Sequence, residues 1–189
     1  MVLLLAAPAF AMLQPGAAAP DFTATASQAG KDFTFSLKDA LKKGPVVVYF
    51  YPAAYTGGCD LEAHTFATRK DDFDKAGATI IGVSADSIQR LNSFSSDPDF
   101  CAGKFPVASD ANGKIAASYG LKLIPPQPGL KDVRGQTITH GFIPRTTFVI
   151  AQDGKIVSAL SSDKDHLKPD QHVTKALAIV RQMRAGKMQ

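Results

Sequence analysis

The chain has 189 residues, of which 45% are apolar and 20% charged, a composition typical of one globular domain with a full hydrophobic core. Lys and Arg number 21 against 17 Asp and Glu, and these charges are scattered without interleaved aromatic residues, which argues against a nucleic-acid surface. Two cysteines in a chain of this size also exclude a scaffold that depends on disulfides for its stability.

The N-terminus begins with an apolar run, Val2–Ala11, which is too short to span a bilayer. The run ends in the tripeptide AFA, an A-x-A pattern typical of a cleaved signal peptide, although the basic segment that should precede it is missing. We therefore expect a truncated signal peptide and linker over residues 1–19, and a folded domain over 20–189. This pattern favours export to the periplasm over the alternative, a hydrophobic tail on a cytoplasmic protein, and we expect no stable membrane association.

The first predicted elements in chain order lead to a central strand and a long helix. Short alternations of polar and apolar residues around Ala29–Asp32 predict an N-terminal β-hairpin. A short helix is expected over Ser36–Lys43, before a Gly-Pro pair. The continuous β-branched and aromatic run Val46–Tyr51 predicts a buried central strand, and a helix should follow over 57–76.

The second half of the chain continues the alternation of strands and helices. Residues 122–142 contain three prolines in the stretch PPQP, which excludes a central strand or helix interior there and predicts a loop. The element order predicts an α/β, thioredoxin-like fold: a central mixed sheet flanked by helices, with an N-terminal β-hairpin. The expected elements are strands over 78–84, 145–150 and 155–160, and helices over 86–96, within 110–121 and over 166–184.

Cys59 lies where the central strand gives way to the helix that follows. If that helix begins near Thr56, the free N–H groups of its first turn and its dipole favour a thiolate. An unperturbed cysteine, with a pKa of about 8.5, is only a few per cent thiolate at neutral pH, so this help matters for reactivity. The carboxylates of Asp60 and Glu62 act in the opposite direction, and a nearby cation is therefore needed. The alternative is that Cys59 is a small buried hydrophobe and Thr56 only a helix cap.

Pro52, Thr56 and Cys59 form the pattern P-x-x-x-T-x-x-C directly after the apolar strand. This pattern resembles the peroxidatic motif of the peroxiredoxins, the AhpC/TSA-type thiol peroxidases. The likeness continues at GFIPRTTFVIAQDGKI, which is similar to the segment where the family carries its active-site arginine and places that arginine at Arg145. It extends over roughly Pro20–Ala178, nearly the whole predicted domain.

Within the family, the stretch TGGCDLEA is most similar to the Q-type, or bacterioferritin-comigratory, branch, which has a glutamate at the position of Glu62. Many members of that branch place a resolving cysteine five residues after the peroxidatic one, where this chain has His64. The second cysteine here is Cys101, and another subgroup of the branch carries its resolving cysteine in that region. The resemblance thus implies an intrachain disulfide between Cys59 and Cys101; the alternative is a one-cysteine enzyme in which Cys101 stays unpaired.

The resemblance implies that the Cys59 thiolate attacks one peroxide oxygen and becomes a sulfenic acid, while water or an alcohol leaves. Arg145 would lower the pKa of the thiol and hold the peroxide. Thr56 and the Cys59 backbone N–H would bind the peroxide oxygens, and Pro52 would shield the sulfur. Gly58 would leave room for a small molecule to approach the backbone.

The function expected from this resemblance is reduction of hydrogen peroxide or organic hydroperoxides by a monomer without metal or organic cofactor, recycled by thioredoxin or a similar dithiol protein. An alternative is a peroxide-sensing or chaperone-like thiol protein without rapid turnover. A copper carrier of the same fold would need CxxxC after the first strand, which is absent. A metal site of Cys59, His64 and Cys101 would lack a fourth ligand. We expect His166 and His172 to be solvated, in or before the last helix.

Overall fold

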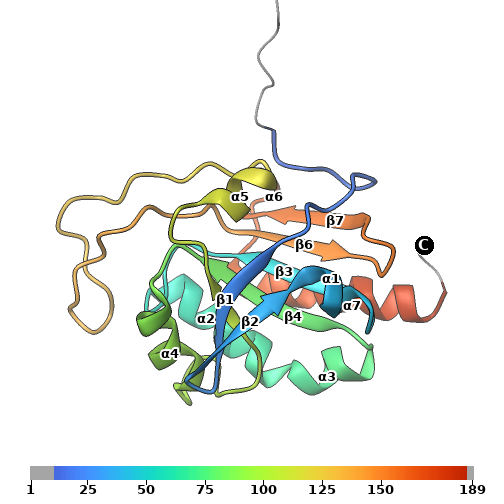
Figure 1. Cartoon of the computed structure of the whole chain (residues 1–189), viewed down its shortest axis with the longest axis horizontal. Coiled ribbons are helices and arrows are strands. Elements are labelled where there is room, and N and C mark those ends of the chain that lie inside the picture. The colour runs from blue at the N-terminus through green and yellow to red at the C-terminus, as the bar shows by residue number, and fades with distance from the viewer. Residues whose placement is uncertain (1–10, 187–189) are drawn as a thin grey trace, which may run out of the picture.

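The computed structural model describes residues 11–186 of the chain, and almost all of the apolar run behind the export prediction lies outside them. Seven strands form one sheet in the order β2-β1-β5-β4-β3-β6-β7 (Figure 1). β3, β4 and β5 are parallel to one another, whereas the other pairs are antiparallel, so the predicted mixed sheet is confirmed. The strands are β1 (Thr23–Gln28), β2 (Lys31–Ser36), β3 (Val46–Phe50), β4 (Thr79–Ser84), β5 (Val107–Ser109), β6 (Thr146–Ile150) and β7 (Ile156–Ser161).

Helices cover both faces of the sheet and enclose two apolar cores. Because side chains alternate along a strand, β3 sends Val47 and Tyr49 to one core and Val48 and Phe50 to the other. The first core is completed by α2, α3, α4 and α7, the second by α1, α5 and the N-terminal segment. The helices are α1 (Leu37–Leu41), α2 (Gly57–Thr68), α3 (Lys70–Lys75), α4 (Ile88–Ser96), α5 (Lys114–Ser118), α6 (Ser162–Asp165) and α7 (Pro169–Arg184). In the described part of the chain, none of them is both apolar and long enough to span a bilayer.

Two predicted elements differ from the structure, and one strand was not predicted. The helix expected over 57–76 is two helices, because Arg69 leaves helical geometry at φ −100°, ψ 6° between α2 and α3. The last helix begins at Pro169 rather than near residue 166, with proline at its favoured first position, and the separate short helix α6 precedes it. The sequence prediction missed β5, a strand of only three residues.

Residues 13–19, assigned to a linker on composition, pack against the folded domain. The N–H of Gly16 donates to the carbonyl of Ile156, the first residue of β7, and that of Ala19 donates to the carbonyl of Gly154 in the turn before β7, each at 2.8 Å. Leu13 donates in the same way to the carbonyl of Tyr119 at 3.1 Å. The backbone of this stretch thus continues the edge of the sheet beside β7, and the boundary between linker and domain stays a prediction.

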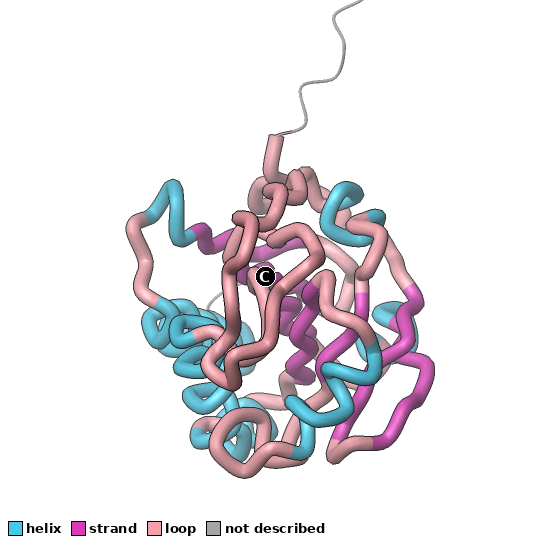
Figure 2. Tube along the Cα trace, turned by 90° about the vertical axis from the view of Figure 1, so that its left-hand side faces the viewer, coloured by secondary structure: helices cyan, strands magenta, loops and turns pink. Residues whose placement is uncertain are grey.

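The proline-containing segment 122–142 is irregular, as predicted, apart from two isolated bridges, Ile124–Phe142 and Lys131–Thr137. It forms the long yellow-to-orange excursion at the left of Figure 1, and Figure 2 views the molecule from that side. There the chain consists mostly of loops and turns. This excursion contacts the turn between β3 and α2, which leads to Cys59.

Candidate active site

The turn between β3 and α2 presents Cys59 near the start of a helix. β3 is buried over its whole length, and the chain leaves it through Pro52 and through Tyr55, whose positive φ of 60° ends the extended path. Thr56 occupies the N-cap position in extended geometry and α2 begins at Gly57, as expected from the sequence. Cys59, the third residue of α2, is 2% exposed.

Arg145 is the cation that faces the Cys59 sulfur. It directly precedes β6, which runs antiparallel to β3 with Thr146 opposite Phe50, so the strand register brings Arg145 to the end of β3 where the Cys59 turn begins. Its Nη2 donates to Cys59 Sγ at 3.1 Å, and its side chain is only 10% exposed. The pairing joins residues 86 positions apart in the chain.

Glu62 holds the other side of the same guanidinium. It lies almost one turn after Cys59 on α2, is fully buried and accepts a hydrogen bond from Arg145 Nη1. Burial raises the pKa of Glu62 to about 7, against the opposing effect of Arg145. The carboxylate therefore orients Arg145 and titrates close to neutral pH.

Two opposing effects act on the pKa of Cys59. Complete burial raises it, while the Arg145 guanidinium and hydrogen bonds with Ala53 and Thr56 lower it. Burial is the larger effect, so the pKa stands above its ordinary value, and the net lowering expected from the helix start is not found in this closed site. The thiolate consequently depends on Arg145 as its nearby positive charge.

The two donors assigned to the peroxide are engaged within the turn. The Thr56 hydroxyl donates to the Ala53 carbonyl at 2.8 Å and makes no capping hydrogen bond to the helix. The Cys59 N–H donates to the Thr56 carbonyl at 2.7 Å. A peroxide that used either donor would have to compete with these contacts, which the Thr56 hydroxyl can leave by a rotation of its side chain.

Gly58 and Pro52 both lie close to Cys59 in the sequence, Gly58 directly before it in α2 and Pro52 in the preceding turn. A Cβ atom at Gly58 would stand 3.2 Å from Arg145 Nη2 and 3.4 Å from Pro169 Cγ, so glycine leaves room for the guanidinium. The space predicted for a ligand at Gly58 is therefore largely occupied by Arg145. Pro52 is partly buried in the turn that precedes Cys59.

Cys101 lies in a turn after α4 and belongs to the same apolar core as Cys59. Both cysteines are free, and Cys101 is completely buried. Backbone hydrogen bonds to the carbonyls of Ser95 and Asp97 hold this turn together. Burial, with the negative charges of Asp97 and Asp60 adding to it, keeps the pKa of Cys101 well above its usual range. Of the two cysteines, Cys59 has the environment that favours a nucleophile.

The histidines are placed differently from one another. His172, expected in solvent, is fully buried: Nδ1 lies 3.0 Å from the Thr147 hydroxyl and Nε2 lies 3.0 Å from that of Ser162. Burial and the nearby Arg145 charge lower its pKa to about 4. The apolar period of α7, which places His172 in line with Ala176 and Val180, is the signal that could have revealed this. Exposed His64 bonds the Asp99 carbonyl through Nδ1 at 3.0 Å and so links α2 to the Cys101 turn.

Among residues 11–186, no three His, Cys, Asp or Glu side chains are arranged so that they could hold a metal ion. What the site offers is a buried thiol, a guanidinium in contact with it and a carboxylate behind the guanidinium.

A cysteine near a helix start, in contact with an arginine on a thioredoxin-like sheet, is an arrangement typical of a thiol-dependent redox enzyme. The model of the AhpC/TSA family matches residues 15–159. The chain belongs to this family and is a peroxiredoxin, a thiol-dependent peroxidase.

Individual relatives agree with this assignment. A Mycobacterium tuberculosis protein that carries a peroxiredoxin name is 36% identical over 146 residues, covering 77% of this chain and 84% of its own length. The chloroplastic peroxiredoxin Q of Sedum lineare is 28% identical over 176 residues, 93% of this chain and 82% of the relative. The crystal structure of the Mycobacterium tuberculosis peroxidoxin BcpB matches with a TM-score of 0.74 and 30% identity, covering 90% of this chain and 98% of that one.

Proposed function

We propose that Cys59 is the peroxidatic cysteine and that it reduces hydrogen peroxide or organic hydroperoxides. The observation that carries this proposal is the 3.1 Å contact between Arg145 Nη2 and Cys59 Sγ, the one thiol–guanidinium contact among the described residues. Guanidinium is always protonated, so it stabilises the thiolate and can hold a peroxide oxygen at the same time.

In the first step, the Cys59 thiolate attacks one oxygen of ROOH and the O–O bond breaks. Cys59 becomes a sulfenic acid and the leaving oxygen takes a proton to become ROH, so that a thiol and ROOH give Cys–SOH and ROH. Arg145 stabilises the negative charge that develops on the leaving oxygen, and the Thr56 hydroxyl can turn from Ala53 to donate to it. Glu62 keeps the guanidinium in place through the hydrogen bond on its other side.

Cys101 is proposed to resolve the sulfenic acid. Its thiol attacks the Cys59 sulfur and releases water, which leaves an intrachain disulfide for thioredoxin or a similar dithiol protein to reduce. Both cysteines are free in the structure, so their sulfurs must still approach to about 2 Å, and we propose that the two segments move to allow it. The working unit is proposed to be a monomer that does not associate stably with membranes.

Intact-mass spectrometry after one equivalent of hydrogen peroxide tests these assignments. The wild type should lose two hydrogens, Cys101→Ser should gain one oxygen, and Cys59→Ser should do neither. A stable gain of one oxygen in the wild type would contradict resolution by Cys101 and point to a one-cysteine enzyme. A single stoichiometric reaction without turnover in the presence of thioredoxin would favour the sensor or chaperone-like alternative.

A further inference from the structure

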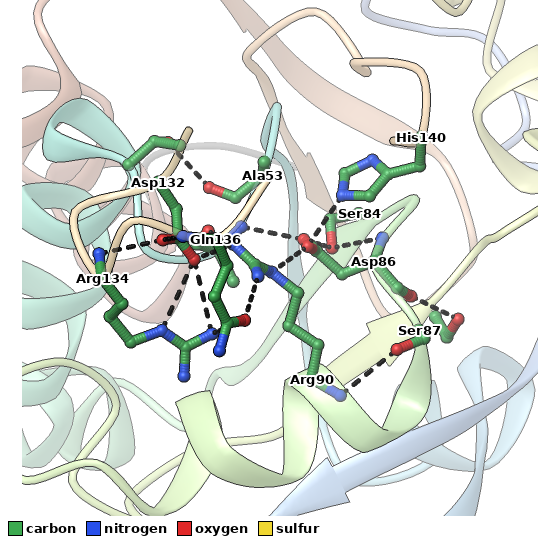
Figure 3. A network of polar contacts seen from close by, with 12 residues as sticks. Ala53, Ser84, Asp86, Ser87, Arg90, Asp132, Arg134, Gln136 and His140 are labelled. Atoms are coloured by element: carbon green, nitrogen blue, oxygen red, sulfur yellow. Dashed lines mark hydrogen bonds and ion pairs between the residues drawn. The ribbon is translucent and has the colours of Figure 1, made fainter. Parts of the chain in front are cut away.

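Four charged residues hold the turn that precedes Cys59, and we call them the clasp: Asp86, Arg90, Asp132 and Arg134 (Figure 3). Asp86, just after β4, accepts a hydrogen bond from the N–H of Ala54 at 2.8 Å. Arg90, on α4, donates from Nη2 to the carbonyl of Ala54 at 2.8 Å. Both backbone polar groups of this turn residue are therefore tied to the clasp.

Arg90 joins the two carboxylates of the clasp. Its Nη2 donates to Asp132 Oδ2 at 2.7 Å, and its Nε lies 2.8 Å from Asp86 Oδ1 as an ion pair, without the alignment of a hydrogen bond. Both aspartate side chains are fully buried, and that of Arg90 is 13% exposed. Separating one partner from such a buried pair is strongly unfavourable, so the cluster resists opening.

The clasp also fastens the excursion 122–142 over the turn. Asp132 accepts backbone N–H groups from Arg134 at 2.9 Å and Gln136 at 2.8 Å, which shapes this part of the excursion into a compact bend. Between Asp132 and Arg134, the N–H of Val133 donates to the carbonyl of Tyr55 at 2.9 Å. The excursion is therefore attached to the Cys59 turn by a backbone hydrogen bond in addition to the side chains.

Tyr55 connects the two cysteine-bearing segments. Its backbone has the left-handed φ of 60°, a strained conformation for a bulky residue that the surroundings must maintain. The guanidinium carbon of Arg134 lies 3.2 Å from the centroid of its ring. The same ring packs edge-on against Phe100, at 5.4 Å between centroids, and Phe100 is the neighbour of Cys101.

None of the clasp's hydrogen bonds or ion pairs among the described residues is made with Cys59 or Arg145, so it acts on the site only through the position of the turn. We propose that Arg90, Asp132 and Arg134 are positioning residues that set how readily the Cys59 turn opens. They thereby decide how the Cys59 sulfenic acid divides between its two fates.

This inference rests on the proposed function, in which Cys101 resolves Cys59. In one fate, Cys59–SOH and Cys101–SH form a disulfide and release water, which requires the turn to open. In the other, Cys59–SOH reacts with a second ROOH to give the sulfinic acid Cys59–SO₂H and ROH, while the turn stays closed beside Arg145. A firmer clasp favours over-oxidation, and a weaker clasp favours the disulfide.

Arg134→Ala tests the inference, because this side chain is 32% exposed and its removal leaves the Arg90 pair in place. The contact between the Arg134 cation and the Tyr55 ring stabilises the closed turn. Its loss should therefore speed disulfide formation by roughly two- to five-fold. The peroxide concentration that over-oxidises half of the protein should rise by the same factor. The first reaction with peroxide should stay within about two-fold of the wild-type rate, because the closed turn remains the main state.

The chain has no tryptophan, so the three species are followed by quenched flow, alkylation and intact-mass spectrometry. Arg134→Lys, which keeps the charge, should fall between wild type and Arg134→Ala. Arg181→Ala, which removes a half-exposed arginine that pairs with Asp72 and makes no contact with the clasp, is the matched control and should match the wild type. If Arg134→Ala reacts normally with the first peroxide but forms the disulfide at an unchanged or slower rate, the proposed role of the clasp is refuted. Failure of wild-type Cys59 to react with peroxide would instead reject the proposed function.

Discussion

Replacement of Arg145 by alanine is the most direct test of the active site. Arg145 supplies the charge-assisted hydrogen bond to Cys59 Sγ and the ion pair with buried Glu62, and its own side chain is 10% exposed. Removal of one preorganised donor to a developing negative charge typically lowers a rate by about 10²–10³-fold. We expect a decrease of this order in the reaction of Cys59 with hydrogen peroxide, together with a further rise in the pKa of the Cys59 thiol, because burial then acts without its main opponent.

Arg145→Ala should lose less stability than is usual when one partner of a buried ion pair is removed. Separating a buried ion pair costs about 3–5 kcal/mol when the remaining charge is trapped. Here the remaining group is Glu62, whose pKa is already about 7, so it can take up a proton and become neutral. Folding at neutral pH should therefore survive, and circular dichroism would verify it.

The assay is the second-order rate of thiol loss at pH 7, measured by quenched flow, with iodoacetamide alkylation against pH for the pKa of Cys59. Arg145→Lys keeps the charge but loses the planar pair of donors, so it should show a clear decrease in rate and a smaller rise in pKa than Arg145→Ala. Arg181→Ala serves again as the matched control, since Arg181 pairs with Asp72 at the surface. Equal rates in wild type, Arg145→Lys and Arg145→Ala would refute the role of the guanidinium.

Three further predictions concern the cysteines and the carboxylate behind Arg145. Cys59→Ser should lose nearly all peroxidase activity with its fold intact, because an alcohol keeps its proton at neutral pH; retention of a substantial rate would contradict the assignment. Cys101→Ser should react once with peroxide, then stall with thioredoxin and over-oxidise at lower peroxide; full thioredoxin-dependent turnover would indicate a one-cysteine enzyme. The folded pKa of Glu62 is raised, so its contribution to stability is greatest at low pH and is lost as pH rises from about 4.5 to about 7. Denaturant melts across that range should show a shallower loss of stability in Glu62→Gln, and identical slopes would contradict the raised pKa.

The sequence alone determined the features that depend on local pattern. The apolar run of β3, the proline and glycines that follow it and the start of the helix that carries Cys59 are encoded in one short stretch, because strand, turn and helix each have their own periodicity and breaker residues. The alternation of strands and helices likewise determined the mixed α/β sheet. Resemblance to a family motif directed attention to Arg145, which no local pattern distinguishes from an exposed arginine.

The tertiary structure decided whatever depends on residues far apart in the chain. The register between β3 and β6 brings Arg145 to Cys59, and full burial then reverses the expected direction of the Cys59 pKa. Packing against Thr147 and Ser162 buries His172, which looked like a surface residue of the last helix. The fastening of the excursion 122–142 to Tyr55 is also invisible in the sequence. Each of these features depends on long-range contacts and on the desolvation that accompanies such contacts. The residues of a single segment specify neither the contacts nor the desolvation.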